Sequence, residues 1–145
     1  MKQILSLLLF CLLSMPLWAQ KEADQILGKW YNTEKSAQVE IYACGDRYCG
    51  KIVWLKEPTY EDGTAKIDKN NPEEKLRSRA LMGLNLLTGF EYDEDNVWED
   101  GEIYDPKEGK TYSCMLTLKP NGELEVRGYV GFSLIGKTVI WTRVK

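Results

Sequence analysis

The sequence predicts an all-β fold: a closed antiparallel barrel of eight strands around one core. Three observations carry this prediction. Apolar and polar residues alternate through eight short runs, which is the pattern of strands with one buried face. Gly28 and Trp30 stand near the start of the first run, and Trp141 and Arg143 stand in the last. Because the first and last strands of a closed barrel are neighbours, Arg143 is expected to lie across the Trp30 ring and close the barrel.

The strands are expected, in order, at 28–33, 37–44, 48–55, 84–92, 97–104, 110–118, 123–130 and 137–144. In the second range Val39 and Ile41 alternate with Glu40, as a half-buried strand requires. The chain shows no internal repeat, and residues 20–145 are enough for one barrel domain with its own core.

The hairpin between the sixth and seventh strands can be aligned by counting. The run 120–122 is Pro-Asn-Gly, a three-residue loop with glycine where a left-handed residue is needed. This loop sets Leu118 opposite Leu124 and Leu116 opposite Val126, so that both apolar pairs share one face. Register and hydrophobic pattern therefore agree.

The long connection from residue 56 to residue 82 interrupts the strand pattern. Asn71 is a helix N-cap candidate, Pro72 suits the first helical position and Glu74 the capping-box position. These residues predict one short helix over 72–79. A connection of this length in a small barrel is usually functional or disordered, and we expect it to act as a lid or plug at a barrel end.

The first 19 residues have the pattern of a secretory signal peptide. Lys2 precedes an apolar run at 4–13, and Ala19 offers a small residue at a cleavage site before Gln20. The apolar run is too short to be a stable membrane span. We therefore expect an exported protein, periplasmic or secreted; an uncleaved anchor is the alternative.

Charge and composition exclude several functions. Without Lys2 the net charge is about −4, and no basic patch stands out, so nucleic acid is not an expected partner. Histidine is absent, which removes the usual general base and the commonest metal ligand. We expect no metal, no cofactor and no catalytic residue. Asp105 with Glu102 is the one carboxylate pair that can be named for an enzyme.

Two of the cysteines suit a disulfide. Cys44 and Cys49 are separated by four residues between two strand patterns, so a four-residue hairpin loop would place them directly opposite each other, and both are expected on the outer face. A structural disulfide across this hairpin fits an oxidising compartment, while a redox or metal pair is the alternative. Cys114 is expected to face inward, opposite Gly128, as a small buried residue.

Four residues are candidates for a ligand-binding pocket: Trp54, Arg79, Tyr104 and Trp141. The two tryptophans are expected to face inward, where they line either a cavity or an ordinary core. Arg79 provides an anion-binding guanidinium, or else complements the C-terminus of the predicted helix. Tyr104 lies at the expected barrel mouth, where rim packing explains it equally well.

The Gly28-x-Trp30 motif with its late Arg143 resembles the signature of lipocalin-like barrels. The chain from Ile26 to Lys145 also resembles a family of exported bacterial proteins, domain-of-unknown-function family 2147. The matching segments are 26–30, 39–42, 44–55, 68–72, 76–79, 83–84, 101–105, 109–112, 127–129 and 141–143. The resemblance implies export and a lipocalin-like (calycin-like) barrel, and it implies no catalytic or binding residue.

Three functions remain open at this stage. The first is an exported barrel that binds a small, partly apolar ligand. The second is an envelope protein-interaction or structural module that uses the 56–82 connection or the apolar loop at 131–136 as its contact with a partner protein. An enzyme is the third and least expected.

Overall fold

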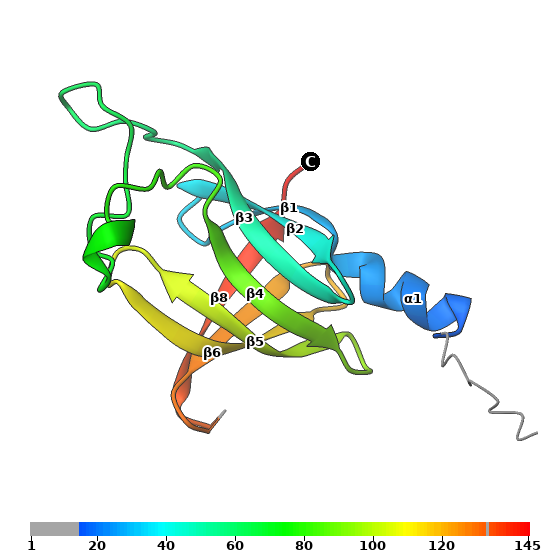
Figure 1. Ribbon diagram of the computed structural model, residues 1–145. Coiled ribbons are helices and arrows are strands. Elements are labelled where there is room, and N and C mark those ends of the chain that lie inside the picture. The colour runs from blue at the N-terminus through cyan, green and yellow to red at the C-terminus, as the bar shows by residue number, and fades with distance from the viewer. Residues whose placement is uncertain (1–14, 133) are drawn as a thin grey trace, which may run out of the picture.

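The computed structural model describes residues 15–132 and 134–145, and it shows one closed barrel of eight antiparallel strands (Figure 1). Each strand pairs with its neighbours in the sequence, and β1 pairs with β8 to close the barrel. The strands are β1 (Gly28–Tyr31), β2 (Ala37–Cys44), β3 (Arg47–Leu55), β4 (Asn85–Tyr92), β5 (Val97–Asp105), β6 (Lys110–Leu118), β7 (Leu124–Tyr129) and β8 (Gly136–Arg143). The predicted fold class is confirmed.

The β6–β7 hairpin has the register that counting predicts. Leu118 pairs with Leu124 and Leu116 with Val126, and Cys114 is buried opposite Gly128. The apolar members of these pairs lie in the interior, where they join a single core. The buried apolar residues are mainly Ala23, Ile26, Trp30, Val39, Ile41, Tyr48, Ile52, Leu84, Leu86, Leu87, Phe90, Trp98, Cys114, Leu116, Leu124, Val126 and Trp141. Of these, Leu86 alternates with the inward Leu87 and therefore lies on the outer wall, beneath the connection that follows β3.

A short helical segment that the strand pattern does not predict closes one end of the barrel, called here the α1 end. It consists of α1 (Leu17–Ala23) and the 3-10 turn η1 (Asp24–Ile26). The Trp98 indole nitrogen donates a hydrogen bond to the Ala23 carbonyl at 3.0 Å, and the Trp30 indole nitrogen donates one to the Ile26 carbonyl at 2.9 Å. Both indoles are fully buried, so these bonds satisfy donors that would otherwise lose water without replacement.

Arg143 closes the barrel as the sequence predicts. Its guanidinium carbon lies 4.2 Å from the centroid of the Trp30 ring, and its terminal nitrogens donate hydrogen bonds to the carbonyls of Leu27 and Gln25. Gly28 makes this approach feasible, because a Cβ there would lie 3.0 Å from an Arg143 nitrogen and the backbone φ is +122°. The cation–π contact thus joins the first strand to the last.

The opposite end, called here the groove end, carries the connection from residue 56 to residue 84. Isolated bridges pair Thr59 with Ala65 and Ile67 with Ala80, so the connection folds back on itself. Asn70 then fastens it to the β5–β6 turn by donating hydrogen bonds to the carbonyls of Pro106 and Lys107. In that turn Gly109 has a φ of +68°, and a Cβ would collide with the Asn70 carbonyl.

The helix predicted over 72–79 is wrong in extent, because only the 3-10 turn η2 (Glu74–Leu76) forms. Asn71 is not its N-cap. Its side-chain amide donates to Asp68, and its side-chain oxygen accepts from the backbone N–H of Glu73. The carbonyl of Arg79 accepts from the backbone N–H of Asp68, which keeps the end of the segment in a β-bridge and out of a helix.

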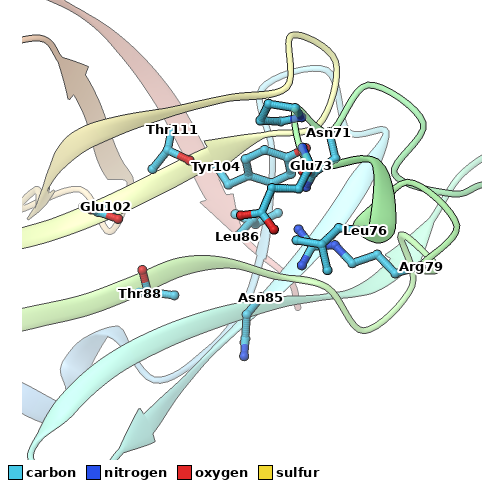
Figure 2. Close-up of a pocket in the computed structure, with 11 residues that line it drawn as sticks. Asn71, Glu73, Leu76, Arg79, Asn85, Leu86, Thr88, Glu102, Tyr104 and Thr111 are labelled. Atoms are coloured by element: carbon cyan, nitrogen blue, oxygen red, sulfur yellow. Dashed lines mark hydrogen bonds between the residues drawn. The ribbon is translucent and has the colours of Figure 1, made fainter.

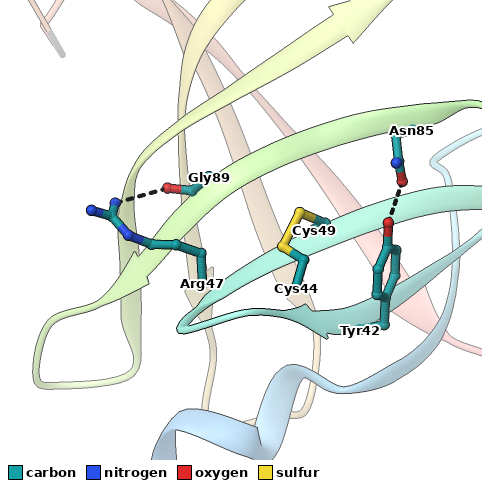
Figure 3. Close-up of a disulfide and its surroundings, with 6 residues drawn as sticks. All are labelled: Tyr42, Cys44, Arg47, Cys49, Asn85 and Gly89. Carbon is teal, nitrogen blue, oxygen red and sulfur yellow. Dashed lines mark hydrogen bonds between the residues drawn. A yellow bond between two sulfur atoms is a disulfide. The ribbon is translucent and has the colours of Figure 1, made fainter.

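The disulfide between Cys44 and Cys49 is present on the outer face, with a Cα–Cα distance of 5.9 Å (Figure 3). The loop is shorter than predicted. Cys44 pairs with Arg47 across a two-residue turn, and Cys49 pairs with Tyr42, so the two cysteines are diagonal neighbours and not directly opposite. Nearby, Arg47 donates to the Gly89 carbonyl on β4, which ties this hairpin to the next strand (Figure 3).

Candidate functional site

A groove of about 240 Å³ lies between the barrel wall and the 56–84 connection, and it is called here the wall groove (Figure 2). The wall is contributed by β4, β5 and β6, and the cover by the segment around η2. The lining residues are Asn71, Pro72, Glu73, Leu76, Arg79, Asn85, Leu86, Thr88, Glu102, Tyr104 and Thr111.

The strand register shows that this groove lies outside the barrel. Leu87 pairs with Ile103, and Leu87 is fully buried in the interior. The next pair, Thr88 with Glu102, therefore projects from the outer face, and both side chains are exposed. The groove therefore lies on the outer wall, under the connection that the sequence predicts to act as a lid or plug, and not inside the barrel.

At the centre of the site is Asp68, whose side chain is fully buried. Its Oδ1 accepts a hydrogen bond from the Tyr104 hydroxyl at 2.6 Å. Its Oδ2 accepts from the Asn71 amide at 2.8 Å and from Arg79 Nε at 2.9 Å. Three donors from two chain segments thus converge on one carboxylate, and a buried carboxylate needs such partners to remain charged.

These contacts determine the ionisation of the network. Burial opposes the charged form of Asp68, but the hydrogen bonds from Tyr104, Asn71 and Arg79 and the charge of Arg79 outweigh it and lower the pKa of this carboxyl. Burial and the bond to Asp68 raise the pKa of Tyr104 to about 12. The network therefore contains a carboxylate, a guanidinium and a neutral phenol at neutral pH.

Arg79 is held so that part of its guanidinium is available to the groove. Only Nε contacts Asp68, and the guanidinium carbon lies 5.7 Å from the centroid of the Tyr104 ring. The side chain is 38% exposed. Within residues 15–132 and 134–145, neither terminal nitrogen of Arg79 has a hydrogen-bond or ion-pair partner. An arginine that is fixed through Nε and open at its other edge can bind a carboxylate or phosphate through two hydrogen bonds.

Two of the four candidate ligand-binding residues are brought together. Arg79 and Tyr104 both line the wall groove and share Asp68 as a partner. Trp141 does not line it: this side chain is 5% exposed and belongs to the core beside Leu124.

Trp54 points outward, which corrects the prediction of an inward indole. Ile52 pairs with Val39 and Trp54 with Gln38, so one extra residue of β3 opposes β2 and the alternation reverses there. Trp54 is 37% exposed, and its ring packs edge-on against Tyr31 with the ring centroids 6.1 Å apart. It therefore lies on the outer wall and does not line the groove.

Sequence reasoning missed Asp68 and Asn71 as site residues. Their partners Arg79 and Tyr104 lie 11 and 36 residues beyond Asp68, so no local pattern links them. The available signal was the 68–72 segment, one of those that resemble the family, to which no role was assigned.

Other features of the described residues do not compete with this site. A second, more open hollow at the α1 end is bordered by Arg143, whose terminal nitrogens already bind backbone carbonyls.

Burial raises the pKa of the Cys114 thiol to about 12, which is unsuited to a nucleophile. Over residues 15–132 and 134–145 no cluster of three or more Asp, Glu, Cys or His is placed to hold a metal ion. No helix in the same part of the chain is long and apolar enough to cross a membrane.

Comparison with solved structures places the fold in a known class. The chain is similar to protein HP1028 from the human pathogen Helicobacter pylori, which is described as belonging to the lipocalin family. The two chains are 27% identical, the match covers 83% of each, and the TM-score is 0.72. The protein is therefore a lipocalin-like barrel.

The family of the chain follows from its sequence. Residues 28–143 match the model of a family described as uncharacterized protein conserved in bacteria (DUF2147), and the chain belongs to this family. No curated protein matches it.

Proposed function

We propose that this protein is an exported binding protein that holds a small, partly apolar ligand in the wall groove. The observation that carries the proposal is the open guanidinium edge of Arg79, fixed by a buried carboxylate beside the apolar side chains of Leu76 and Leu86. Binding sites for small molecules combine an apolar surface with a few well-held polar groups. Eight-stranded barrels of the lipocalin class are also known to hold small ligands.

The proposed role is binding without chemical conversion. The chain has no histidine, the usual base that activates a serine or cysteine nucleophile. The two acidic side chains that line the wall groove, Glu73 and Glu102, are both exposed. We propose no metal and no cofactor.

Export is part of the proposal and rests on the sequence of residues 1–19, of which 1–14 lie outside the described residues. The exposure of α1 supports cleavage after Ala19. Leu17 and Trp18 are 89% and 67% exposed, whereas Ala23 and Ile26 are buried in the core. Removal of the first 19 residues would therefore leave the α1 end closed. The Cys44–Cys49 disulfide is typical of an oxidising compartment.

Native mass spectrometry of the exported protein tests the proposal, with three proteins compared. Thr88→Trp places an indole in the groove, while Thr138→Trp places one on an exposed stretch of β8 that does not line it. We expect a co-purifying mass of a few hundred daltons, on the order of the size such grooves hold, in the wild type and in Thr138→Trp but not in Thr88→Trp. Equal ligand content in all three proteins would contradict binding in the wall groove.

A second function is favoured by the β7–β8 loop, residues 130–135. Val130, Phe132, Leu134 and Ile135 are between 67% and 90% exposed at the groove end. Apolar side chains gathered in this way often mark a protein contact. If the protein is an envelope interaction module, the double substitution Phe132→Ser and Leu134→Ser should abolish partner capture while the melting temperature stays unchanged.

A further inference from the structure

The wall groove holds opposite charges that do not neutralise each other. Arg79 presents its open guanidinium edge, and Glu102 presents a carboxylate that, among the described residues, has no hydrogen-bond or ion-pair partner. Figure 2 shows Glu102 and Arg79 toward opposite ends of the groove. The other lining carboxylate, Glu73, has the Lys75 ammonium 3.7 Å away, so its charge is partly balanced.

Figure 2 shows the Glu73 carboxylate between these two charges, and the rest of the surface between them is apolar or neutral. Leu86 comes from the barrel wall and Leu76 from the cover, and Pro72 lies beside them. Thr88 and Thr111 add hydroxyl groups without charge. A ligand that reaches from Arg79 to Glu102 therefore passes the Glu73 carboxylate, whose charge Lys75 partly balances, and lies against the apolar side chains of Leu76 and Leu86.

A ligand with one charge uses only part of this surface. A simple carboxylate can bind Arg79, but it adds a negative charge to a groove that already contains two carboxylates. A simple amine can bind Glu102, but it leaves the Arg79 edge unused and brings a second cation toward it. A molecule that carries both a carboxylate and an ammonium group can pair with Arg79 and with Glu102, and it leaves the net charge of the groove unchanged.

We propose that the wall groove binds a short zwitterion whose carboxylate and ammonium groups are separated by an apolar stretch. The carboxylate contacts the terminal nitrogens of Arg79, the ammonium contacts Glu102, and the apolar body lies against Leu76 and Leu86. Asp68 is the positioning residue, because its bond to Arg79 Nε leaves the opposite edge of the guanidinium toward the ligand. This inference rests on the ligand-binding function proposed above and names the class of ligand.

Three compounds with the same six-carbon chain test it: 6-aminohexanoate, hexanoate and hexylamine. Each is titrated into ¹⁵N-labelled protein lacking residues 1–19 while the amide of Thr88 and the Nε–H of Arg79 are followed by NMR. We expect 6-aminohexanoate to bind about fivefold more tightly than either singly charged compound, the discrimination of one partly exposed charge pair. The amino acids 4-aminobutanoate and 8-aminooctanoate, titrated in the same way, show which separation of ammonium and carboxylate fits the groove. Equal affinity for hexanoate and the amino acids would overturn the inference.

Glu102→Gln provides the decisive variant, because an exposed glutamate can be replaced without disturbing the core. It should remove the preference for 6-aminohexanoate over hexanoate and leave hexanoate binding in place. Glu40→Gln, on β2 opposite Lys51 and outside the groove, is the matched control and should keep the preference. A preference that survives Glu102→Gln would overturn the assignment of the ammonium site.

The two proposals fail in different ways. If none of these compounds binds but a co-purifying ligand is still excluded by Thr88→Trp, the zwitterion inference is wrong and the binding function stands. If Thr88→Trp has no effect on any bound molecule, both are wrong.

Discussion

At the α1 end of the barrel, buried indoles donate hydrogen bonds to the carbonyls of α1 and η1, and apolar side chains fill the interior. At the groove end, a buried carboxylate gathers polar side chains, and apolar side chains are left exposed on the β7–β8 loop. The side chains at the α1 end thus form part of the hydrophobic core, whereas those at the groove end form a surface on which polar groups are held in place. We therefore expect the α1 end to contribute most to the stability of the fold, and the binding function proposed above belongs to the groove end.

The largest loss of stability is expected from removing a core side chain at the α1 end. Trp98→Ala removes a fully buried indole and should lower the free energy of unfolding by about 3–5 kcal/mol, because the cavity cannot collapse completely. The matched control is Trp54→Ala on the outer wall, where loss of the Tyr31 contact should cost about 1 kcal/mol. Urea unfolding followed by circular dichroism measures both. Similar losses in the two variants would contradict the comparison.

The disulfide gives the next effect. The double variant Cys44→Ser and Cys49→Ser should lose about 2 kcal/mol, the chain-entropy value for so short a loop. Because the bridge lies on the outer face of β2 and β3, ligand binding in the wall groove should persist. A reducing agent should destabilise the wild type by the same amount and leave the double variant unchanged, and a difference between the two treatments would argue against a purely structural bridge.

At the groove end, Asp68→Asn should lower the free energy of unfolding by roughly 1–2 kcal/mol, because Arg79 and Tyr104 lose a charged acceptor. It should also lower the affinity for an anionic group in the groove. Thr111→Ala, a change at an exposed groove residue outside the network, serves as a control for nonspecific loss.

The pH dependence of the free energy of unfolding tests whether Asp68 stabilises the network as a charged carboxylate. The pKa of Asp68 is lowered in the folded state, so its stabilising contribution is present above the unfolded-state pKa of about 4 and is lost as the pH falls through the folded-state value. Wild-type stability should therefore fall more steeply below about pH 4 than that of Asp68→Asn. Parallel acid-unfolding curves would show that the carboxylate is not the charged centre of the network.

The smallest effect is expected on the β7–β8 loop. Phe132 is 76% exposed, and Phe132→Ser should change the free energy of unfolding by less than about 0.5 kcal/mol. Thermal unfolding measures this, and a larger loss would mean that the loop packs against the barrel in solution.

The strand order and the register of the β6–β7 hairpin could be predicted from the sequence because both depend on local patterns. The Pro-Asn-Gly loop and the alternation around it align Leu118 with Leu124 from neighbouring residues alone. The closure of the barrel by Arg143 on Trp30 could also be predicted, since a closed barrel places its first and last strands together. The pairing of Cys44 with Cys49 follows from their closeness in the chain, whatever the exact loop length.

The wall groove was decided by tertiary structure. The orientation of Trp54 depends on a β-bulge between β3 and β2, which reverses the alternation of inward and outward side chains. The residue pattern of β3 does not predict this bulge. The site at Asp68 depends on donors 11 and 36 residues away, which meet only after the 56–84 connection folds onto the barrel wall. The alternation of apolar and polar residues is a local property of the sequence, and it was enough to determine the barrel. A buried charge, in contrast, must be stabilised by hydrogen-bond donors that come from distant parts of the chain. The position of the site was therefore decided only when the folded chain brought these donors together.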